Sequence, residues 1–235
     1  MKLFLSGYGK MGHMIEDLAK NWEIVGHADI DCLDNYDTAP KADVCLDFSG
    51  VGALPKVVDY ARRTKTPLVS GTTGLTEPDM DLLRALSEEV PVIWTANYST
   101  GIAVFRKLLR DYAPVLQGWD KELVEMHHNQ KVDAPSGTAK LLLSELDPDG
   151  TAAVVHGREG ICGKRKPEEI GVFSLRGGTV AGEHSVYFFG EDETLQITHS
   201  ASSRKVFAAG ALRAAEAIIG REPAFYTLEQ LLFRD

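Results

Sequence analysis

The residues best suited to chemistry lie within one short stretch, residues 127–139. His127 and His128 are adjacent, and Lys131 follows four residues after the first, so titratable and cationic groups stand at the end of an apolar, strand-like run. Residues 136–138, Ser-Gly-Thr, follow at the expected start of a helix, where free backbone N–H groups and the helix dipole favour an anion. Together these groups would suit a small substrate that carries carboxylates.

A structural interpretation of the same stretch stays open. Adjacent histidines on a strand point to opposite faces, so only one points straight into a given pocket unless the strand ends between them. In isolation, His127 and His128 could also be a core or surface pair. No metal site is expected, because the pair has no helical spacing and no cysteine nearby.

A glycine turn near the N-terminus is the second candidate site. Residues 7–12, Gly-Tyr-Gly-Lys-Met-Gly, form G-x-G-x-x-G between an expected strand and an expected helix. In dinucleotide-binding folds the first glycine makes the turn, the second lets the backbone approach a pyrophosphate, and the third lets helix pack on strand. Asp29, 22 residues after Gly7, could accept from a ribose hydroxyl. The alternative is a glycine turn without a ligand.

Two further turns follow expected strands, Gly71-Thr72-Thr73-Gly74 and Ala96-Asn97-Tyr98-Ser99. Doubly wound sheets bind ligands at the carboxyl ends of their strands, so these turns could hold a nicotinamide and its ribose. The alternative is local turn chemistry, in which Gly, Thr and Asn satisfy nearby backbone groups.

The elements that must position these residues suggest two kinds of sheet. The first hundred residues alternate apolar, β-branched runs with helical periodicity, which is typical of a parallel sheet with crossover helices. The connection 29–41 shows little helical pattern, so its crossover helix is expected to be missing or reduced. The expected strands are 2–6, 23–28, 43–47, 67–70 and 91–95, and the expected helices are 11–21, 52–65 and 77–89.

After residue 97 the pattern changes to fewer helices and closely spaced strands. Glycines separate three expected strands after residue 171, which predicts a meander. The glycine-rich segments 176–178, 182–184 and 199–204 could be turns and helix caps or supports of the pocket. The expected elements are an amphipathic helix at 99–117, strands at 122–128, 171–176, 183–189 and 194–200, and helices from 136, at 205–219 and at 227–233.

Composition argues against a polyanionic partner. The chain has 235 residues, with 25 Lys+Arg against 34 Asp+Glu and a formal net charge of −9. At roughly 150 residues per domain, this length allows one large domain or two small ones. No Lys/Arg cluster offers the basic face that nucleic acid or an anionic membrane requires. The functional surface is therefore expected to be a local pocket.

The sequence predicts a cytosolic protein with reduced thiols. No apolar run reaches the roughly 18 to 20 residues that span a bilayer, and glycines follow the first residues too soon for a signal peptide. Cys32, Cys45 and Cys162 are odd in number and match no metal or disulfide spacing.

The stretch Glu125–Ala139, EMHHNQKVDAPSGTA, resembles the E-x-H-H-x-x-K-x-D-A-P-S-G-T-A signature of the dihydrodipicolinate reductase family. The resemblance covers nearly the whole chain. It includes the glycine turn and the segments 47–49, 71–74, 96–99, 156–160, 176–178, 182–184 and 198–204.

The resemblance implies NAD(P)H-dependent reduction of 4-hydroxy-tetrahydrodipicolinate with loss of water, in lysine and diaminopimelate synthesis. It implies that His127 donates a proton, that Lys131 is a second acidic group, and that a homotetramer forms. The implied ligands of the two substrate carboxylates are His128, Lys131, Ser136, Gly137 and Thr138. The implied cofactor contacts are Gly7, Tyr8, Gly9, Lys10, Met11, Gly12, Asp29, Gly71, Thr72, Thr73, Thr95, Ala96, Asn97 and Tyr98.

Departures from the family pattern concern the cofactor. The glycine turn is one residue tighter than in many relatives, and Ile30 follows Asp29 where some relatives carry an arginine. A carboxylate without an adjacent cation favours NADH over NADPH, because a 2′-phosphate would lie beside it unpaired. Lys10 and the loop to Lys41 could still supply a cation. The helix after Thr138 is also shorter than in many relatives.

The sequence therefore predicts an α/β protein of two domains. A Rossmann-like dinucleotide-binding domain is expected at residues 1–97 and 204–235, and an α+β substrate-binding and oligomerisation domain with an open mixed sheet at 98–203. One alternative is another nicotinamide oxidoreductase, similar to aspartate dehydrogenase, against which the H-H-x-x-K stretch argues. The other is an NADH-sensing regulator, which would need a basic DNA-reading helix.

Overall fold

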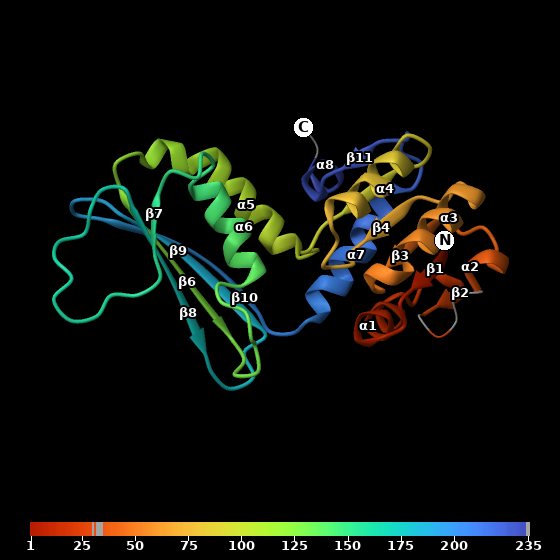
Figure 1. Ribbon diagram of the computed structural model, residues 1–235, viewed down its shortest axis with the longest axis horizontal. Helices are drawn as coiled ribbons and strands as arrows, with labels where there is room; N and C mark the ends of the chain where they lie inside the picture. The colour runs from red at the N-terminus through yellow and green to blue at the C-terminus, as the bar shows by residue number, and fades with distance from the viewer. Residues whose placement is uncertain (30, 32–34, 234–235) are drawn as a thin grey trace. The chain divides into compact units, whose positions relative to one another are not determined.

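The chain divides into two compact units. The computed structural model describes residues 1–29, 31 and 35–233, so Ile30 and Cys32 lie outside the described residues. The first unit comprises Met1–Thr100 and Lys205–Asp235, and the second comprises Gly101–Arg204. Figure 1 shows both units with most of their elements labelled.

The first unit is built on a six-stranded sheet with the order β11-β5-β4-β3-β1-β2. All of its neighbouring strands pair in parallel. From β1 the chain passes to β2 on one side and later to β3 on the other, which creates a switch point at the carboxyl ends of β1 and β3. The strands are β1 (Lys2–Ser6), β2 (Glu23–Ala28), β3 (Val44–Asp47), β4 (Leu68–Ser70), β5 (Val92–Trp94) and β11 (Phe225–Tyr226).

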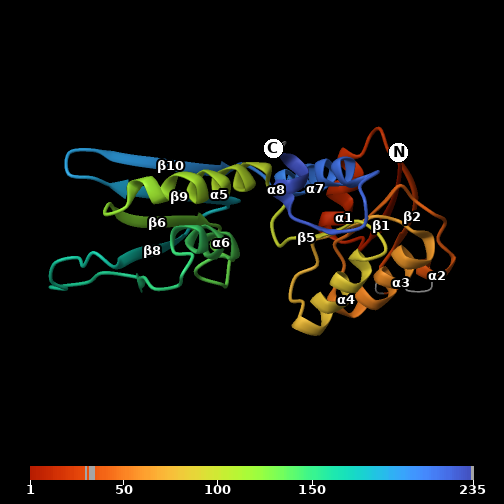
Figure 2. The same cartoon turned by 90° about the horizontal axis from the view of Figure 1, so that it is seen from above.

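Helices cover both faces of this sheet. Figure 2 shows α2, α3 and α4 on one side and α1, α7 and α8 on the other. The expected Rossmann-like architecture is confirmed, including the reduced second crossover, whose described residues contain one α-helical turn, α2. The helices are α1 (Lys10–Leu18), α2 (Asn35–Thr38), the 3₁₀ turn η2 (Val51–Ala53), α3 (Leu54–Thr64), α4 (Glu77–Ser87), α7 (Lys205–Ile218) and α8 (Leu228–Leu232).

Helix α7 packs unusually close to the segment after β5. A Cβ built on Gly210 would lie 1.7 Å from the carbonyl oxygen of Tyr98. Only glycine allows this approach, and the helix buries Ala208, Ala211 and Ile218 beside it. The C-terminal residues thereby complete the hydrophobic packing that the first hundred residues begin.

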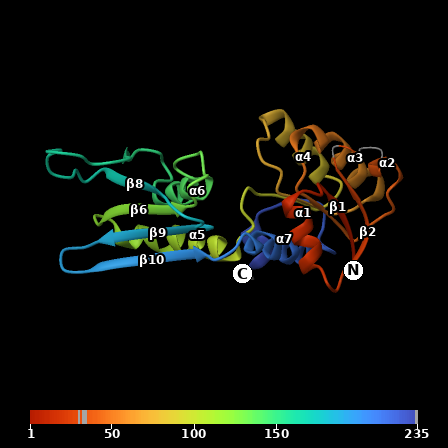
Figure 3. The ribbon, with the colours of Figure 1, turned by 90° about the horizontal axis from the view of Figure 1, so that it is seen from below.

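The second unit is a five-stranded mixed sheet with the order β10-β9-β6-β8-β7. Its helices lie on one face, and in Figure 3 the strands are seen from the opposite face, on which no helix of the described residues lies. The elements are α5 (Thr100–Tyr112), the 3₁₀ turn η3 (Ala113–Leu116), β6 (Asp120–His127), α6 (Gly137–Leu146), β7 (Ala153–Val155), β8 (Glu169–Arg176), β9 (Gly182–Phe189) and β10 (Thr194–Ala201).

The open mixed sheet is confirmed, but the expected meander is wrong. β9 and β10 form an antiparallel pair, whereas β6 lies between β8 and β9, parallel to the first and antiparallel to the second. The connection 177–181 crosses the end of β6, where the N–H of Gly177 donates to the carbonyl of His127. A glycine-rich connection of this length can reach the next strand or the one beyond, so turn residues alone do not fix strand order.

One expected helix is shorter than predicted, and two short strands were not predicted. The helix expected at 99–117 ends at Tyr112 and continues as a 3₁₀ turn, because Pro114 has no N–H and cannot occupy an α-helix interior. The short strands β7 and β11 have too few residues for an alternating pattern and were not expected.

Among the described residues, no helix is long and apolar enough to cross a membrane.

Replacing Gly210 with alanine should destabilise the first unit. The added methyl would collide with backbone, so we expect Gly210→Ala to lower the free energy of unfolding by about 2 kcal/mol or more. Gly52→Ala is the matched control, because a Cβ there meets no atom within 4 Å. Urea unfolding measures both variants. Equal stability of the two would contradict the close packing of α7.

Candidate active site

The core face of β6 changes from apolar to polar toward the end of the strand. Side chains alternate between faces along a strand, so Leu123, Glu125 and His127 share the face that packs against α5 and α6. Leu123 and Glu125 have no exposed surface, and His127 is 9% exposed. A buried carboxylate and an imidazole therefore lie side by side where the hydrophobic core ends.

Strand register extends this polar patch across the sheet. Glu125 lies opposite Ser174 on β8 and His184 on β9. His127 lies opposite Arg176 on β8. Three adjacent strands thus contribute polar side chains to one end of the face.

Glu125 accepts hydrogen bonds at both carboxylate oxygens. Arg176 donates from Nη1 to Oε2 at 2.9 Å and from Nη2 to Oε1 at 2.8 Å. The backbone N–H of Ser136 donates to Oε1 at 3.2 Å, and Nδ1 of His127 lies 2.5 Å from Oε2. Burial raises the pKa of Glu125, but hydrogen bonds from Arg176, Ser174 and His127 outweigh it and lower the pKa to about 2. The carboxylate is charged at neutral pH.

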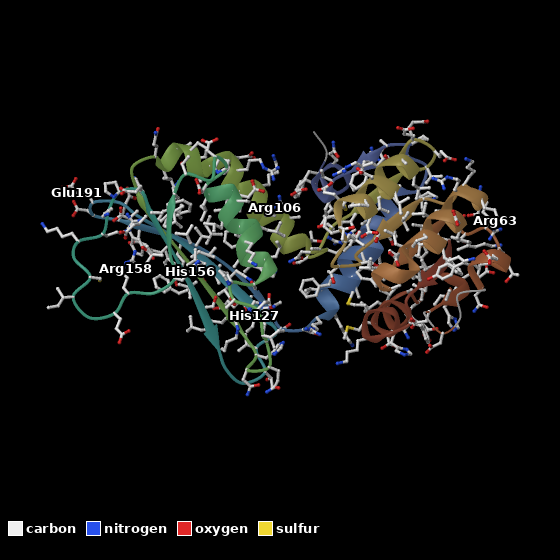
Figure 4. All side chains as sticks on the ribbon, in the orientation of Figure 1. Arg63, Arg106, His127, His156, Arg158 and Glu191 are labelled. Atoms are coloured by element: carbon white, nitrogen blue, oxygen red, sulfur yellow. The ribbon has the colours of Figure 1, made fainter. Side chains whose placement is uncertain are left out.

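His127 has one ring nitrogen engaged and the other directed at a glycine. Because Glu125 is ionised, Nδ1 of His127 carries the proton of their hydrogen bond. Nε2 would lie 3.1 Å from a Cβ built on Gly182, so the absence of a side chain leaves room beside it. Burial lowers the pKa of His127, and Lys131 and Arg176 add to this against the opposite effect of Glu125. Figure 4 shows His127 at the end of the second unit's sheet.

The start of α6 covers this patch. Ser136 is the N-cap, and its hydroxyl accepts from the N–H of Ala139 at 3.1 Å and contacts Nε2 of His184 at 3.1 Å. Ser136 is 1% exposed, so its hydroxyl is committed within the protein. Gly137, the first helical residue, is exposed, and its N–H belongs to the turn that lacks helical acceptors.

Lys131 lies in the loop between β6 and α6, where it forms an ion pair. Its Nζ lies 2.7 Å from Oδ1 of Asp133, and this hydrogen bond lowers the pKa of Asp133. Nη2 of Arg176 donates to the carbonyl oxygen of Asp133 at 2.6 Å. The N–H of His128 donates to the carbonyl of Val180 at 2.8 Å. The structure therefore places the predicted site residues between 127 and 138 at one end of the second unit.

The glycine turn of the first unit has the shape that a dinucleotide requires. Gly7 has a φ of +86°, and a Cβ on it would lie 2.5 Å from the backbone of Phe48. A Cβ on Gly12 would lie 2.4 Å from the Gly7 carbonyl oxygen, whereas one on Gly9 would meet no atom within 4 Å. Gly9 caps α1 without a side-chain hydrogen bond, so open space adjoins the positive end of the helix.

Asp29 and Tyr8 are positioned beside this turn. The N–H of Tyr8 donates to Oδ2 of Asp29 at 2.9 Å, which places the carboxylate at the end of β2 next to the turn. The Tyr8 ring lies 4.2 Å from that of His13 and 4.4 Å from that of His27, between centroids. The open helix start and the adjacent carboxylate thus fit a dinucleotide.

Asp47 organises the carboxyl edge of the same sheet. It has no exposed surface and lies at the end of β3. It accepts from the hydroxyls of Ser6 at 2.7 Å, Ser49 at 2.6 Å, Ser70 at 2.7 Å and Thr72 at 2.9 Å. One carboxylate thereby joins the ends of β1, β3 and β4 at the switch point.

Several predicted cofactor residues have their side chains engaged in local structure. Thr72 and Tyr98 are each 1% exposed, and the Tyr98 hydroxyl donates to the carbonyl oxygen of Ser70 at 2.6 Å. Oδ1 of Asn97 accepts from the N–H of Ser99 at 2.8 Å. Cofactor contacts in the segments 71–73 and 95–98 stay a prediction, and they would depend on backbone groups and on the more exposed members of each turn.

Sequence reasoning missed that Glu125, Arg176 and His184 lie beside His127. The two-residue spacing of Glu125 and His127 places them on one face of a strand, and this was the available signal. Arg176 and His184 belong to glycine-rich segments whose function the sequence left open, because their position depends on strand register.

Comparison with known families agrees with this geometry. Residues 1–98 match the model of "Dihydrodipicolinate reductase, N-terminus", and residues 101–232 match that of "Dihydrodipicolinate reductase, C-terminus". The chain belongs to the dihydrodipicolinate reductase family. The family resemblance of the signature stretch is thereby confirmed.

Individual members of the family match nearly the whole chain. A 4-hydroxy-tetrahydrodipicolinate reductase of Exiguobacterium sibiricum is 43% identical and covers 98% of this chain and 96% of its own. That of Caldanaerobacter subterraneus subsp. tengcongensis is 42% identical and covers 95% and 94%. A dipicolinate-bound dihydrodipicolinate reductase structure from Paenisporosarcina sp. TG-14 has a TM-score of 0.81 at 22% identity, covers 99% of both chains, and shares the fold.

Burial of His184 should make the protein less stable in acid. Burial lowers the pKa of His184 to about 4, and the neighbouring His127 adds to this. A histidine in the unfolded chain takes up its proton near pH 6.5, so acid favours unfolding between pH 6.5 and pH 4. Between pH 8 and pH 5, we expect wild type to lose about 2 kcal/mol more unfolding free energy than His184→Gln.

Urea unfolding at the two pH values measures this difference. The matched control is Tyr187→Phe on the same strand, which keeps every histidine and should follow wild type. The same pH dependence in wild type and His184→Gln would contradict a neutral buried imidazole.

Proposed function

We propose that the chain catalyses NAD(P)H-dependent reduction of 4-hydroxy-tetrahydrodipicolinate to tetrahydrodipicolinate with loss of water, in diaminopimelate and lysine synthesis. The observation that carries this proposal is the likeness, over at least 95% of the chain, to 4-hydroxy-tetrahydrodipicolinate reductases that are 37% to 43% identical. The geometry of the second unit supports it, because a cation, an imidazole and a helix start share one end of a sheet.

The substrate's two carboxylates are assigned to the cationic and N–H donors at this end. His128, Lys131 and the backbone of Gly137 and Thr138 hold them. Lys131 would exchange its ion pair with Asp133 for a substrate carboxylate, because both offer the same charge-assisted hydrogen bond. Ser136 is proposed to take part as the cap that sets the direction of this helix start. Dipicolinate, bound in the Paenisporosarcina reductase, is a planar dicarboxylate of the same class.

His127 is assigned as the proton donor. The dianionic substrate brings negative charge beside the ring and raises its pKa, which favours the imidazolium form when substrate is bound. The Nε2 proton then passes to the ring carbon next to the reduced one, while Nδ1 keeps its hydrogen bond to Glu125. The fixed charge of Lys131 balances the negative charge that develops on the substrate.

The first unit is assigned the cofactor. Its glycine turn, residues 7–12, would hold the pyrophosphate, Asp29 the adenosine ribose, and the segments 71–73 and 95–98 the nicotinamide half. A bound reduced nicotinamide supplies the hydride that reduces the ring. We keep the preference for NADH, because the Asp29 carboxylate lies beside the expected position of the 2′-hydroxyl.

A homotetramer in the cytosol completes the proposal. The face of the second unit's sheet opposite α5 and α6 carries apolar side chains, of which Leu175 is 47% and Phe189 40% exposed. An apolar face of this kind suits the packing of one sheet against another. By strand register it comprises Val124, Met126, Phe173, Leu175, Tyr187 and Phe189.

Substitution of the proposed proton donor His127 or of the proposed carboxylate ligand Lys131 should abolish turnover and spare cofactor binding. We expect His127→Ala and Lys131→Ala each to lower kcat by about 100-fold or more, with NADH affinity within about twofold of wild type. The matched controls, His156→Ala and Lys140→Ala in the same unit, should keep wild-type rates.

The assay follows NADH oxidation with substrate made freshly from pyruvate and aspartate semialdehyde by the preceding synthase. Oxaloacetate with ammonia tests the aspartate-dehydrogenase alternative. Near-wild-type turnover in both alanine variants would contradict the assignment, and activity confined to oxaloacetate would contradict the reaction.

The cofactor preference is tested with the same assay. We expect kcat/KM for NADH to exceed that for NADPH by about tenfold, equivalent to about 1.4 kcal/mol. Asp29→Asn keeps an acceptor for the Tyr8 N–H and removes the negative charge. It should therefore lower the ratio of kcat/KM for NADH to kcat/KM for NADPH. Comparable wild-type values for the two cofactors would refute the preference.

A further inference from the structure

We propose that Glu125, held by Arg176, is the positioning residue that orients His127 and fixes which ring nitrogen faces the substrate. This inference deepens the proposed function and rests on it for its kinetic consequence. The inference also predicts which ring nitrogen of His127 carries the proton, and this can be measured without any reaction.

Geometry gives Glu125 direct control of the imidazole. Glu125 and His127 are two residues apart on the core face of β6, and Nδ1 lies 2.5 Å from Oε2. The carboxylate has no exposed surface and the imidazole is 9% exposed. Water therefore competes little with Glu125 for the hydrogen bond of Nδ1. With the ring held through Nδ1, Nε2 is directed to the space beside Gly182.

The other partners of Glu125 keep it charged and stationary. A buried carboxylate without donors would become neutral. Here Arg176 forms a two-point contact, at 2.8 and 2.9 Å, and the Ser136 N–H occupies a further acceptor position. Arg176 is itself fixed by donating to the carbonyl oxygens of Leu175 and Asp133. The carboxylate can therefore neither rotate away nor take up a proton near neutral pH.

The charged and titratable neighbours of His127 together set the pKa of its imidazole. Arg176 on β8 and Lys131 in the loop after β6 disfavour the imidazolium, and Glu125 favours it. His184 on β9 lies edge to face with His127, with the ring centroids 5.2 Å apart, and Asp133 is paired with Lys131. Among these groups, Glu125 supplies the negative charge in direct hydrogen bond to the ring.

This arrangement lets the ring cycle between two states without turning. The imidazolium loses its Nε2 proton to the substrate carbon, the N–H bond breaks as the C–H bond forms, and the ring remains neutral with Nδ1 protonated. Water then restores the Nε2 proton. Loss of the carboxylate charge would leave the imidazolium less stable and the ring free to adopt the other tautomer.

A purely structural alternative exists, in which the Glu125–Arg176 pair only fastens β8 to β6. It predicts lower stability with the same pH profile and the same tautomer of His127. The two interpretations therefore separate on measurements other than stability.

The test compares Glu125→Gln with Glu122→Gln in the full chain. Both residues lie on β6 and pair with arginines, but Glu122 lies on the other face, bound to Arg158 and Arg165. For Glu125→Gln we expect kcat to fall at least tenfold at pH 7.5, with the KM for NADH unchanged. The midpoint of the alkaline limb of the pH–activity profile should shift to lower pH by about one pH unit, because a less stable imidazolium forms only at lower pH. Glu122→Gln should keep the wild-type profile.

An NMR measurement of the imidazole nitrogens determines the tautomer of His127 independently of enzymatic activity. In ¹⁵N-histidine-labelled wild type we expect His127, assigned by comparison with His127→Gln, to be protonated at Nδ1 at neutral pH. A wild-type Nε2-protonated tautomer overturns the inference, even if Glu125→Gln does not fold. So does an unchanged pH limb in a folded, active Glu125→Gln. An inactive wild type with the expected tautomer would refute the proposed reaction and leave the positioning by Glu125 standing.

Discussion

A buried negative charge determines how the second unit builds its site. Glu125 stands where the apolar core of the sheet ends, with no access to water, and a charge in that position requires donors on every side. The donors come from three places in the chain: the strand itself through His127, the neighbouring strand through Arg176, and the start of α6 through Ser136. The site takes its shape because these segments must meet at one carboxylate.

The first unit also has a buried carboxylate that needs donors, at the edge of its own sheet. Asp47 is equally buried, but its side-chain donors are hydroxyl groups at the ends of neighbouring parallel strands and in the turns that follow them. Hydroxyl donors leave a carboxylate without a neutralising cation, so the edge around Asp47 gains rigidity and no positive charge. The open N-terminal end of α1 beside Gly9 offers a local positive potential at this edge. In a chain with a formal net charge of −9, this local source of positive potential matters.

Sequence patterns predicted the parts of this protein that depend on local chemistry. The glycine turn, the parallel sheet, the reduced crossover after β2 and the helix start at Gly137 all follow from neighbouring residues and were confirmed. Strand order in the second unit was not predictable, because β6 enters between β8 and β9 through pairings distant in sequence. The same limit hid the meeting of Glu125 with Arg176 and His184, since a one-residue change of register would place them on opposite faces. The resemblance to the family implies the roles of His127 and Lys131, and the structure adds their contacts with Glu125 and Asp133.

The central claim is that a dicarboxylate binds at this end of the second unit and converts His127 to its charged form. Calorimetric titration of the full chain with dipicolinate, in buffers of different ionisation enthalpy at pH 7.5, counts the protons taken up on binding. Net proton uptake in wild type that disappears in His127→Gln is the predicted result. Binding without proton uptake, or the same uptake in both proteins, would contradict it.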